Sequence, residues 1–194
     1  MAPGAPSGAW THAPRERHKV HSAKYNGPTF RVVVEGAELW FAAAHFTISL
    51  QEVEPLHGHN YRLVVELWGD LAPEGWVMDF RQLRGLAAAL CRRLHHRFLL
   101  PMASPLLQVE ETGDAYRLHV GGRQYLLPKE DCLPLPIDNT TAERLAQWLA
   151  WELKASLPSH LPLRRLAVGV EEAPGQSGWY SEELCQGGGY GPGP

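Results

Sequence analysis

The segment that decides the fold is His57-Gly58-His59-Asn60-Tyr61-Arg62-Leu63-Val64-Val65-Glu66-Leu67. Successive side chains of a strand point to opposite faces, so its alternating pattern predicts a half-buried strand. One face carries His57, His59, Tyr61, Leu63, Val65 and Leu67, and the other carries Asn60, Arg62 and Glu66. Two histidines therefore stand at one end of an apolar face.

A preceding strand places a third histidine on a matching face. Leu39, Phe41, Ala43 and His45 alternate in the same way, so His45 ends an apolar face. If the two strands pair as a hairpin, the imidazoles of His45, His57 and His59 converge. Three neutral histidines with an open fourth position describe a catalytic zinc site. An H-x-H pair also occurs by chance, and the pattern alone leaves both interpretations open.

The remaining patterns predict an α+β fold with a mainly antiparallel sheet. Short strands are expected at residues 30–35 and 166–172. One helix begins after the N-cap Asp79, and a second follows the capping box Thr140-Thr141-Ala142-Glu143. The apolar helical positions are Phe80, Leu83, Leu86, Ala87, Leu90 and Leu94 in the first helix and Leu145, Trp148, Leu149 and Leu153 in the second. Residues 101–136, between the helices, are expected to form a β-like insert of short strands, broken at Gly113-Asp114 and at Gly121-Gly122.

Composition narrows the function classes. The chain has 194 residues, and its 18 Lys+Arg against 21 Asp+Glu give a net charge of −3, which argues against a nucleic-acid binder. No apolar run reaches the roughly 20 residues of a membrane span, and no signal peptide is recognised. Three distant cysteines favour a reducing, cytoplasmic location. We expect a flexible arm over residues 1–28, one domain over 29–183 and a Gly/Pro-rich tail over 184–194.

The ordered set of motifs resembles the 6-pyruvoyl-tetrahydropterin synthase / 6-carboxy-tetrahydropterin synthase family. The segments that carry the resemblance are Phe41–Phe46, Leu56–Tyr61, Val77–Phe80, His96–Leu99, Thr140–Glu143 and Glu172–Pro174. The resemblance implies a tunnelling fold, in which a four-stranded antiparallel sheet carries two helices on one face. It also implies a homo-oligomer, commonly a hexamer built from two trimers, with active sites between subunits.

The resemblance further implies the site residues. His45, His57 and His59 would bind Zn²⁺, Glu172 would anchor a pterin ring, and Thr140 and Thr141 would lie near it. The implied substrate is 7,8-dihydroneopterin triphosphate. A carboxylate suits the anchoring role because it accepts two hydrogen bonds from the ring amino group and the adjacent N–H.

The chain departs from the family pattern at two places. Residues 49–56 contain no cysteine to act as the base, and Glu52 or Glu54 are the candidates there. The family's Asp-His pair is replaced by His95-His96, which keeps the catalytic histidine at His96 but loses its carboxylate partner.

Several functions therefore stay open. The leading hypothesis is a zinc-dependent lyase of the 6-carboxy-tetrahydropterin synthase type, as in queuosine precursor synthesis. The alternatives are glutamate-dependent side-chain cleavage to 6-hydroxymethyl-dihydropterin for folate, a base supplied by Cys132 of the insert, and a non-catalytic pterin-binding protein.

Overall fold

The computed structural model describes residues 29–184. The expected arm lies outside the described residues, as does nearly all of the expected tail. The elements in chain order are β1 (Phe30–Val34), β2 (Trp40–His45), β3 (His57–Gly69), α1 (Phe80–Leu94), β4 (Arg97–Pro101), β5 (Gln108–Thr112), β6 (Ala115–Val120), β7 (Arg123–Pro128), a 3₁₀ turn (Lys129–Asp131), β8 (Cys132–Leu135), α2 (Ala142–Ser156), β9 (Leu163–Ala173) and β10 (Gln176–Glu183).

The long strand β3 organises the main sheet. The strand order is β10-β9-β3-β2-β4-β8, and β1 also pairs with β3 along the half that β2 leaves free. β2 and β3 form the expected antiparallel hairpin, in which His45 lies opposite His57 and Ala43 opposite His59. This register brings the three histidines to the same end of the sheet.

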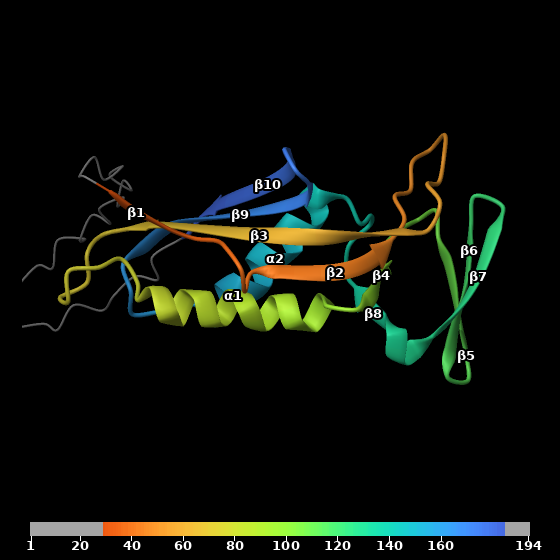
Figure 1. Ribbon diagram of the computed structural model, residues 1–194, viewed down its shortest axis with the longest axis horizontal. Coiled ribbons are helices and arrows are strands. Elements are labelled where there is room, and N and C mark those ends of the chain that lie inside the picture. The colour runs from red at the N-terminus through yellow and green to blue at the C-terminus, as the bar shows by residue number, and fades with distance from the viewer. Residues whose placement is uncertain (1–28, 185–194) are drawn as a thin grey trace, which may run out of the picture.

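Both helices cover one face of this sheet (Figure 1). The core between them contains the inward side chains of β3, including Tyr61, Leu63, Val65 and Leu67, which are all at most 1% exposed. The predicted core positions of α2 are buried, as are Leu83, Ala87, Leu90 and Leu94 of α1. The prediction for Phe80 was wrong, because this first helical residue turns outward and is 56% exposed.

The insert folds into a separate three-stranded sheet, β5-β6-β7, at one end of the molecule (Figure 1). The predicted breaks are tight turns, where Gly113, Gly121 and Gly122 all have positive φ. A second hydrophobic core joins this sheet to β4 and to the loop between β2 and β3. Its buried members are Phe46, Ile48, Val53, Phe98, Leu100, Leu107, Leu118, Val120 and Cys132.

The α+β class and the two helices on one face are confirmed, but the main sheet is larger than the four antiparallel strands expected. It has seven strands, because β4 adds to β2 and β8 adds to β4, both in parallel, and β10 adds to β9. β4 and β8 flank the insert, so the insert extends the main sheet as well as forming its own. No described helix is long and apolar enough to cross a membrane.

Candidate functional site

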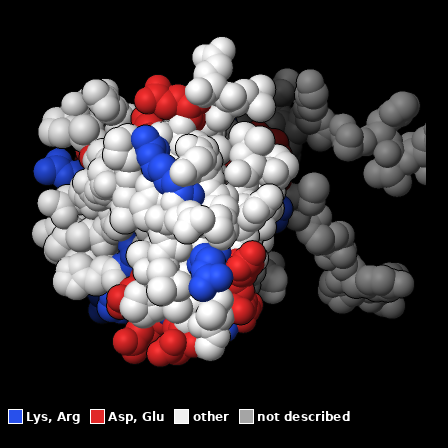
Figure 2. Space-filling model, turned by 90° about the vertical axis from the view of Figure 1, so that its right-hand side faces the viewer, with Lys and Arg blue, Asp and Glu red and all other residues white. Residues whose placement is uncertain are grey.

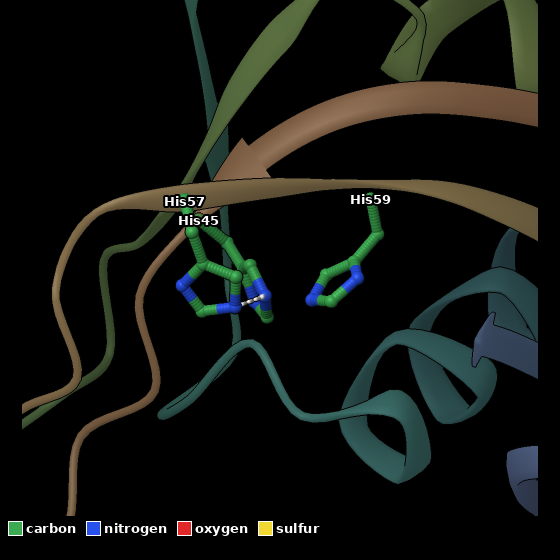
Figure 3. Close-up of side chains that lie close together, drawn as sticks. All are labelled: His45, His57 and His59. Carbon is green, nitrogen blue, oxygen red and sulfur yellow. Dashed lines mark hydrogen bonds between the residues drawn. The ribbon is translucent and has the colours of Figure 1, made fainter.

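The side chains of His45, His57 and His59 converge beside the end of the β2–β3 hairpin (Figure 3). One ring nitrogen of each lies within 4.8 Å of the other two. The Nε2 atoms of His45 and His57 are only 3.1 Å apart. His45 is buried, whereas His57 and His59 are half-buried, so the group is open on one side.

The hydrogen bonds of His45 Nδ1 and His57 Nδ1 determine which ring nitrogens are free to bind a metal ion. His45 Nδ1 lies 3.0 Å from the Thr140 carbonyl oxygen, and His57 Nδ1 lies 2.7 Å from that of Pro55. A carbonyl only accepts, so each Nδ1 carries the proton and donates it. A neutral ring in that tautomer has its Nε2 lone pair free, so the close Nε2 atoms of His45 and His57 are placed as two ligands of one cation would be. Metal-binding histidines use this same backing by carbonyl groups.

The protonation of His45 agrees with this role. Burial lowers the pKa of His45 to about 4, against the smaller opposing effect of its bond to the Thr140 carbonyl. The imidazole is therefore neutral at pH 7, which is the form that binds a metal ion.

Two buried oxygen atoms lie next to the histidines without partners. Tyr61 is completely buried on the histidine face of β3, and Glu172 is on β9, one position beyond the Arg62–Glu171 register pair. Burial, and then the neighbouring Glu172 carboxylate, raise the pKa of Tyr61. Within residues 29–184, Tyr61 Oη and Glu172 Oε1 make no hydrogen bond of good geometry, although the Glu172 side chain lies close enough to the Tyr61 hydroxyl to raise its pKa by hydrogen bonding as well as by charge. Unpaired buried oxygens are costly, so they indicate a place where a ligand's donors bind.

Glu172 combines burial with a nearby cavity. Burial raises the pKa of its carboxyl group, and the charge of His59 acts in the opposite direction. A cavity of about 340 Å³ is lined by both residues at the end of β9. The sequence pattern did not single out Tyr61 as a site residue, although it lies two positions after His59 on the same face.

The fold of the loop between β2 and β3 gives the two candidate bases, Glu52 and Glu54, different surroundings. The charge of Glu54 acts on His45, Tyr61 and Glu172 in the direction that raises each pKa, by less than burial does, and at His45 burial outweighs it so that the pKa is lowered. Glu52 has no such effect on these residues, and its backbone instead closes a turn with Ser49. Glu54 is therefore the carboxylate that the fold brings to the histidines. Cys132 is buried in the second core, where burial raises its pKa to about 11, so it is an unreactive thiol.

The segment before α2 holds the backbone that follows β2, next to the histidines, through side-chain hydrogen bonds. Thr140 is fully buried, and its Oγ1 donates to the Phe46 carbonyl over 2.9 Å. Asn139 clamps Ile48 with both ends of its amide, at 3.1 and 2.7 Å. The helix N-cap is Thr141, whose Oγ1 accepts from Arg144 N. Sequence reasoning missed Asn139, because nothing local shows that it faces Ile48, in the loop between β2 and β3, 91 residues earlier in the chain.

His95 and His96 lie on the outer side of β2. Their rings stack with centroids 3.9 Å apart, and His95 Nδ1 accepts the N–H of Ala42 over 3.1 Å. His95 is thus committed to the β2 backbone and does not hydrogen-bond its neighbour as a carboxylate would. His96, the second residue after α1, has a positive φ of 58° and is exposed. Among the described residues, no hydrogen bond or ring contact joins either one to the three histidines.

These features agree with the comparisons with known proteins. The family model described as 6-pyruvoyl tetrahydropterin synthase matches residues 35–183. The chain belongs to this family. The match includes the histidine group, the β2–β3 loop, the insert and Glu172.

Relatives within and around the family differ in their named activities. A Methanocaldococcus jannaschii protein assigned as a 6-carboxy-5,6,7,8-tetrahydropterin synthase is 29% identical, over 76% of this chain and 93% of its own. The dihydroneopterin monophosphate aldolase of Pyrococcus furiosus is 27% identical, over 66% and 81%. The Plasmodium vivax 6-pyruvoyltetrahydropterin synthase structure superposes with a TM-score of 0.78 at 28% identity, over 81% of this chain and all of that one. The fold is therefore the one implied by the family resemblance.

Proposed function

We propose that this protein is a zinc-dependent lyase that cleaves the side chain of a phosphorylated 7,8-dihydroneopterin to leave 6-hydroxymethyl-dihydropterin. His45, His57 and His59 hold the metal, Glu54 is the general base and Glu172 anchors the pterin. The observation that carries the proposal is the group of three converging histidines with Glu172 beside it, next to a loop whose Glu54 charge acts on both His45 and Glu172. It rests further on membership of a pterin synthase family.

Zinc is the metal that fits the donor set best. Three neutral imidazoles suit a borderline-soft ion, and they leave one coordination position open for substrate. Two ligands at 2.0–2.1 Å from a tetrahedral zinc lie about 3.3 Å apart. The His45 and His57 Nε2 atoms, at 3.1 Å, are close to that spacing. Bound there, zinc would act as a Lewis acid toward the side-chain oxygens of the substrate.

The pterin ring has matching partners in the anchoring residues. The Glu172 carboxylate accepts from the ring amino group and the adjacent N–H, which satisfies its unpaired Oε1. Tyr61 Oη lies beside it as a second unpaired group. Thr140 and Thr141 are proposed to border the ring, and their hydroxyls also hold β2 and α2 in place.

The chemistry follows from where Glu54 lies. Glu54 takes the proton of the 2′-hydroxyl, and the C1′–C2′ bond breaks as C2′ becomes a carbonyl carbon. The electron pair passes into the pterin ring through C6, and a proton returned to C1′ completes the hydroxymethyl group. The other product is a two-carbon aldehyde that keeps the phosphate. A relative supports this use of a glutamate: a Plasmodium vivax variant with glutamate replaced by alanine is described as a catalytic residue mutant.

A second candidate reaction is that of 6-carboxy-tetrahydropterin synthase. It is favoured by the similarity to the Methanocaldococcus jannaschii protein, which extends over 93% of that relative. It would use the same metal, base and pterin anchor. In either reaction we propose a homo-oligomer of trimers, in which the exposed His96 of one copy serves the site of the next, supported by His95.

Product analysis tests the proposal. The zinc-loaded protein is incubated with 7,8-dihydroneopterin triphosphate or monophosphate, and the pterins are identified by mass spectrometry. We expect 6-hydroxymethyl-dihydropterin. The mass of 6-carboxy-tetrahydropterin would instead establish the second reaction. Unchanged pterin that stays bound to a metal-loaded protein would refute both and indicate a binding protein.

A further inference from the structure

The inserted sheet β5-β6-β7 contacts the loop that carries Glu54 through hydrogen bonds and apolar packing. Figure 1 shows both at the same end of the molecule. Arg123, the first residue of β7, donates through Nη1 to the carbonyl oxygens of Val53 and Glu54, the latter over 3.1 Å. A guanidinium is a charged donor, so these bonds are stronger than those of a neutral side chain.

The turn before Arg123 is shaped to receive the loop. Val53 is buried in the second core with Leu118 and Val120 of β6. At Gly121 a Cβ atom would lie 2.6 Å from Val53 Cγ2, and its φ of +53° disfavours other residues independently. The tip of the β6–β7 hairpin therefore fits closely over the residue before Glu54.

Away from Arg123, the loop is held at Ile48, by the Asn139 amide and by a bridge to Val53, and at Pro55, whose carbonyl oxygen accepts from His57. Its own bonds are the short turn between Ser49 and Glu52 and the bond from Glu54 N to the Thr47 carbonyl oxygen, at 3.0 Å. The Glu54 side chain itself is exposed and forms no ion pair within the described residues. The position of its carboxylate thus depends on the backbone that Arg123 holds.

The charges on the outer surface of the insert do not indicate a binding site for a polyanion. Figure 2 views this end of the molecule, and acidic and basic side chains are interspersed on it without a field of one sign. Such a surface is not suited to a polyanion. The function of the insert is therefore better sought in its contacts with the loop between β2 and β3.

We infer that Arg123 is a positioning residue: the inserted sheet uses it, with Gly121, to set the Glu54 carboxylate against the metal site. This inference rests on the proposed function for its catalytic consequence. Misplacing a catalytic group by about 1 Å costs on the order of a hundredfold in rate. Removing Arg123 is therefore expected to lower kcat tenfold to a hundredfold, with KM and bound zinc unchanged.

The matched control is Arg117, which lies on the same sheet but pairs with Glu110 over 3.6 Å and does not touch the loop. Arg117→Ala makes the same change of charge and is expected to keep kcat within twofold. Arg123→Ala is then combined with Glu54→Gln in a double-mutant cycle. Because Arg123 acts through Glu54, its removal from the Glu54→Gln protein is expected to change the residual rate less than twofold. If Arg123→Ala lowers the rate of the Glu54→Gln protein as much as it lowers the rate of the wild-type protein, the inference is overturned.

Hydrogen exchange gives a readout that needs no turnover. The amides of Ser49 and Glu54 are expected to exchange at least tenfold faster in Arg123→Ala and at the wild-type rate in Arg117→Ala. Unchanged exchange in Arg123→Ala would overturn the anchoring. If that variant does not fold, Arg123→Gln, which keeps a neutral donor, takes its place. A wild-type protein without turnover but with the expected exchange pattern would refute the proposed function and leave the anchoring established.

Discussion

Because His45 is buried, we predict that acid lowers the free energy of unfolding of the metal-free protein. The pKa of His45 is about 4 in the folded protein, against 6.5 for a histidine in an unfolded chain. Between these values the unfolded chain binds the proton and the folded one does not, so the free energy of unfolding falls as pH decreases. At about 1.4 kcal/mol per unit, the full shift corresponds to about 3 kcal/mol. For a chain of this size that is a loss of about 6–12 °C in Tm.

The assay is chemical unfolding of chelator-treated protein at several values between pH 7 and pH 4. The variant His45→Asn keeps a donor for the Thr140 carbonyl but has no titrating ring. We expect the wild-type protein to lose about 3 kcal/mol more than this variant over the range. The control is His160→Asn, since that side chain is exposed. Parallel pH profiles for wild type and His45→Asn would refute the claim that His45 is buried in its neutral form.

Three further predictions concern buried and half-buried side chains. Tyr61→Phe removes a buried hydroxyl without a well-formed hydrogen bond, so the stability of the metal-free protein in denaturant unfolding should change by less than about 1 kcal/mol while pterin binding weakens; a larger loss of stability would show that the approach of the hydroxyl to Glu172 is a well-formed hydrogen bond. Cys91 and Cys132, with pKa values raised by burial to about 12 and 11, should resist iodoacetamide at pH 8 until the protein unfolds, and rapid native labelling would contradict their burial. Asn139→Ala should cost about 1–3 kcal/mol in the same unfolding assay, because it leaves Ile48 N and O without the amide; a change below 0.5 kcal/mol would mean that water replaces it.

The convergence of the three histidines was predictable because it depends on local rules. Period-two alternation fixes the faces of two strands, and a hairpin between sequence neighbours fixes their register. His45, His57 and His59 follow from these two steps, and the observed pairing of His45 with His57 confirms them.

The choice between Glu52 and Glu54 was beyond such rules. It depends on how the loop is folded, and that is set by Arg123, some 70 residues later. The strands β4 and β8 were missed for a similar reason, since their parallel partners lie across a helix or across the insert. β10 was missed because its sequence, Gln176–Glu183, is mostly polar and its pattern is set by its place at the sheet edge.

The central claim is that Glu54 works as the base of a three-histidine metal site. The most direct measurement compares kcat for zinc-loaded wild-type, Glu54→Gln and Glu52→Gln proteins on 7,8-dihydroneopterin triphosphate, with bound zinc measured in each. The account predicts one zinc per chain in all three, a loss of 10²- to 10⁴-fold in Glu54→Gln and near wild-type turnover in Glu52→Gln. Full activity of Glu54→Gln with its zinc in place would contradict it.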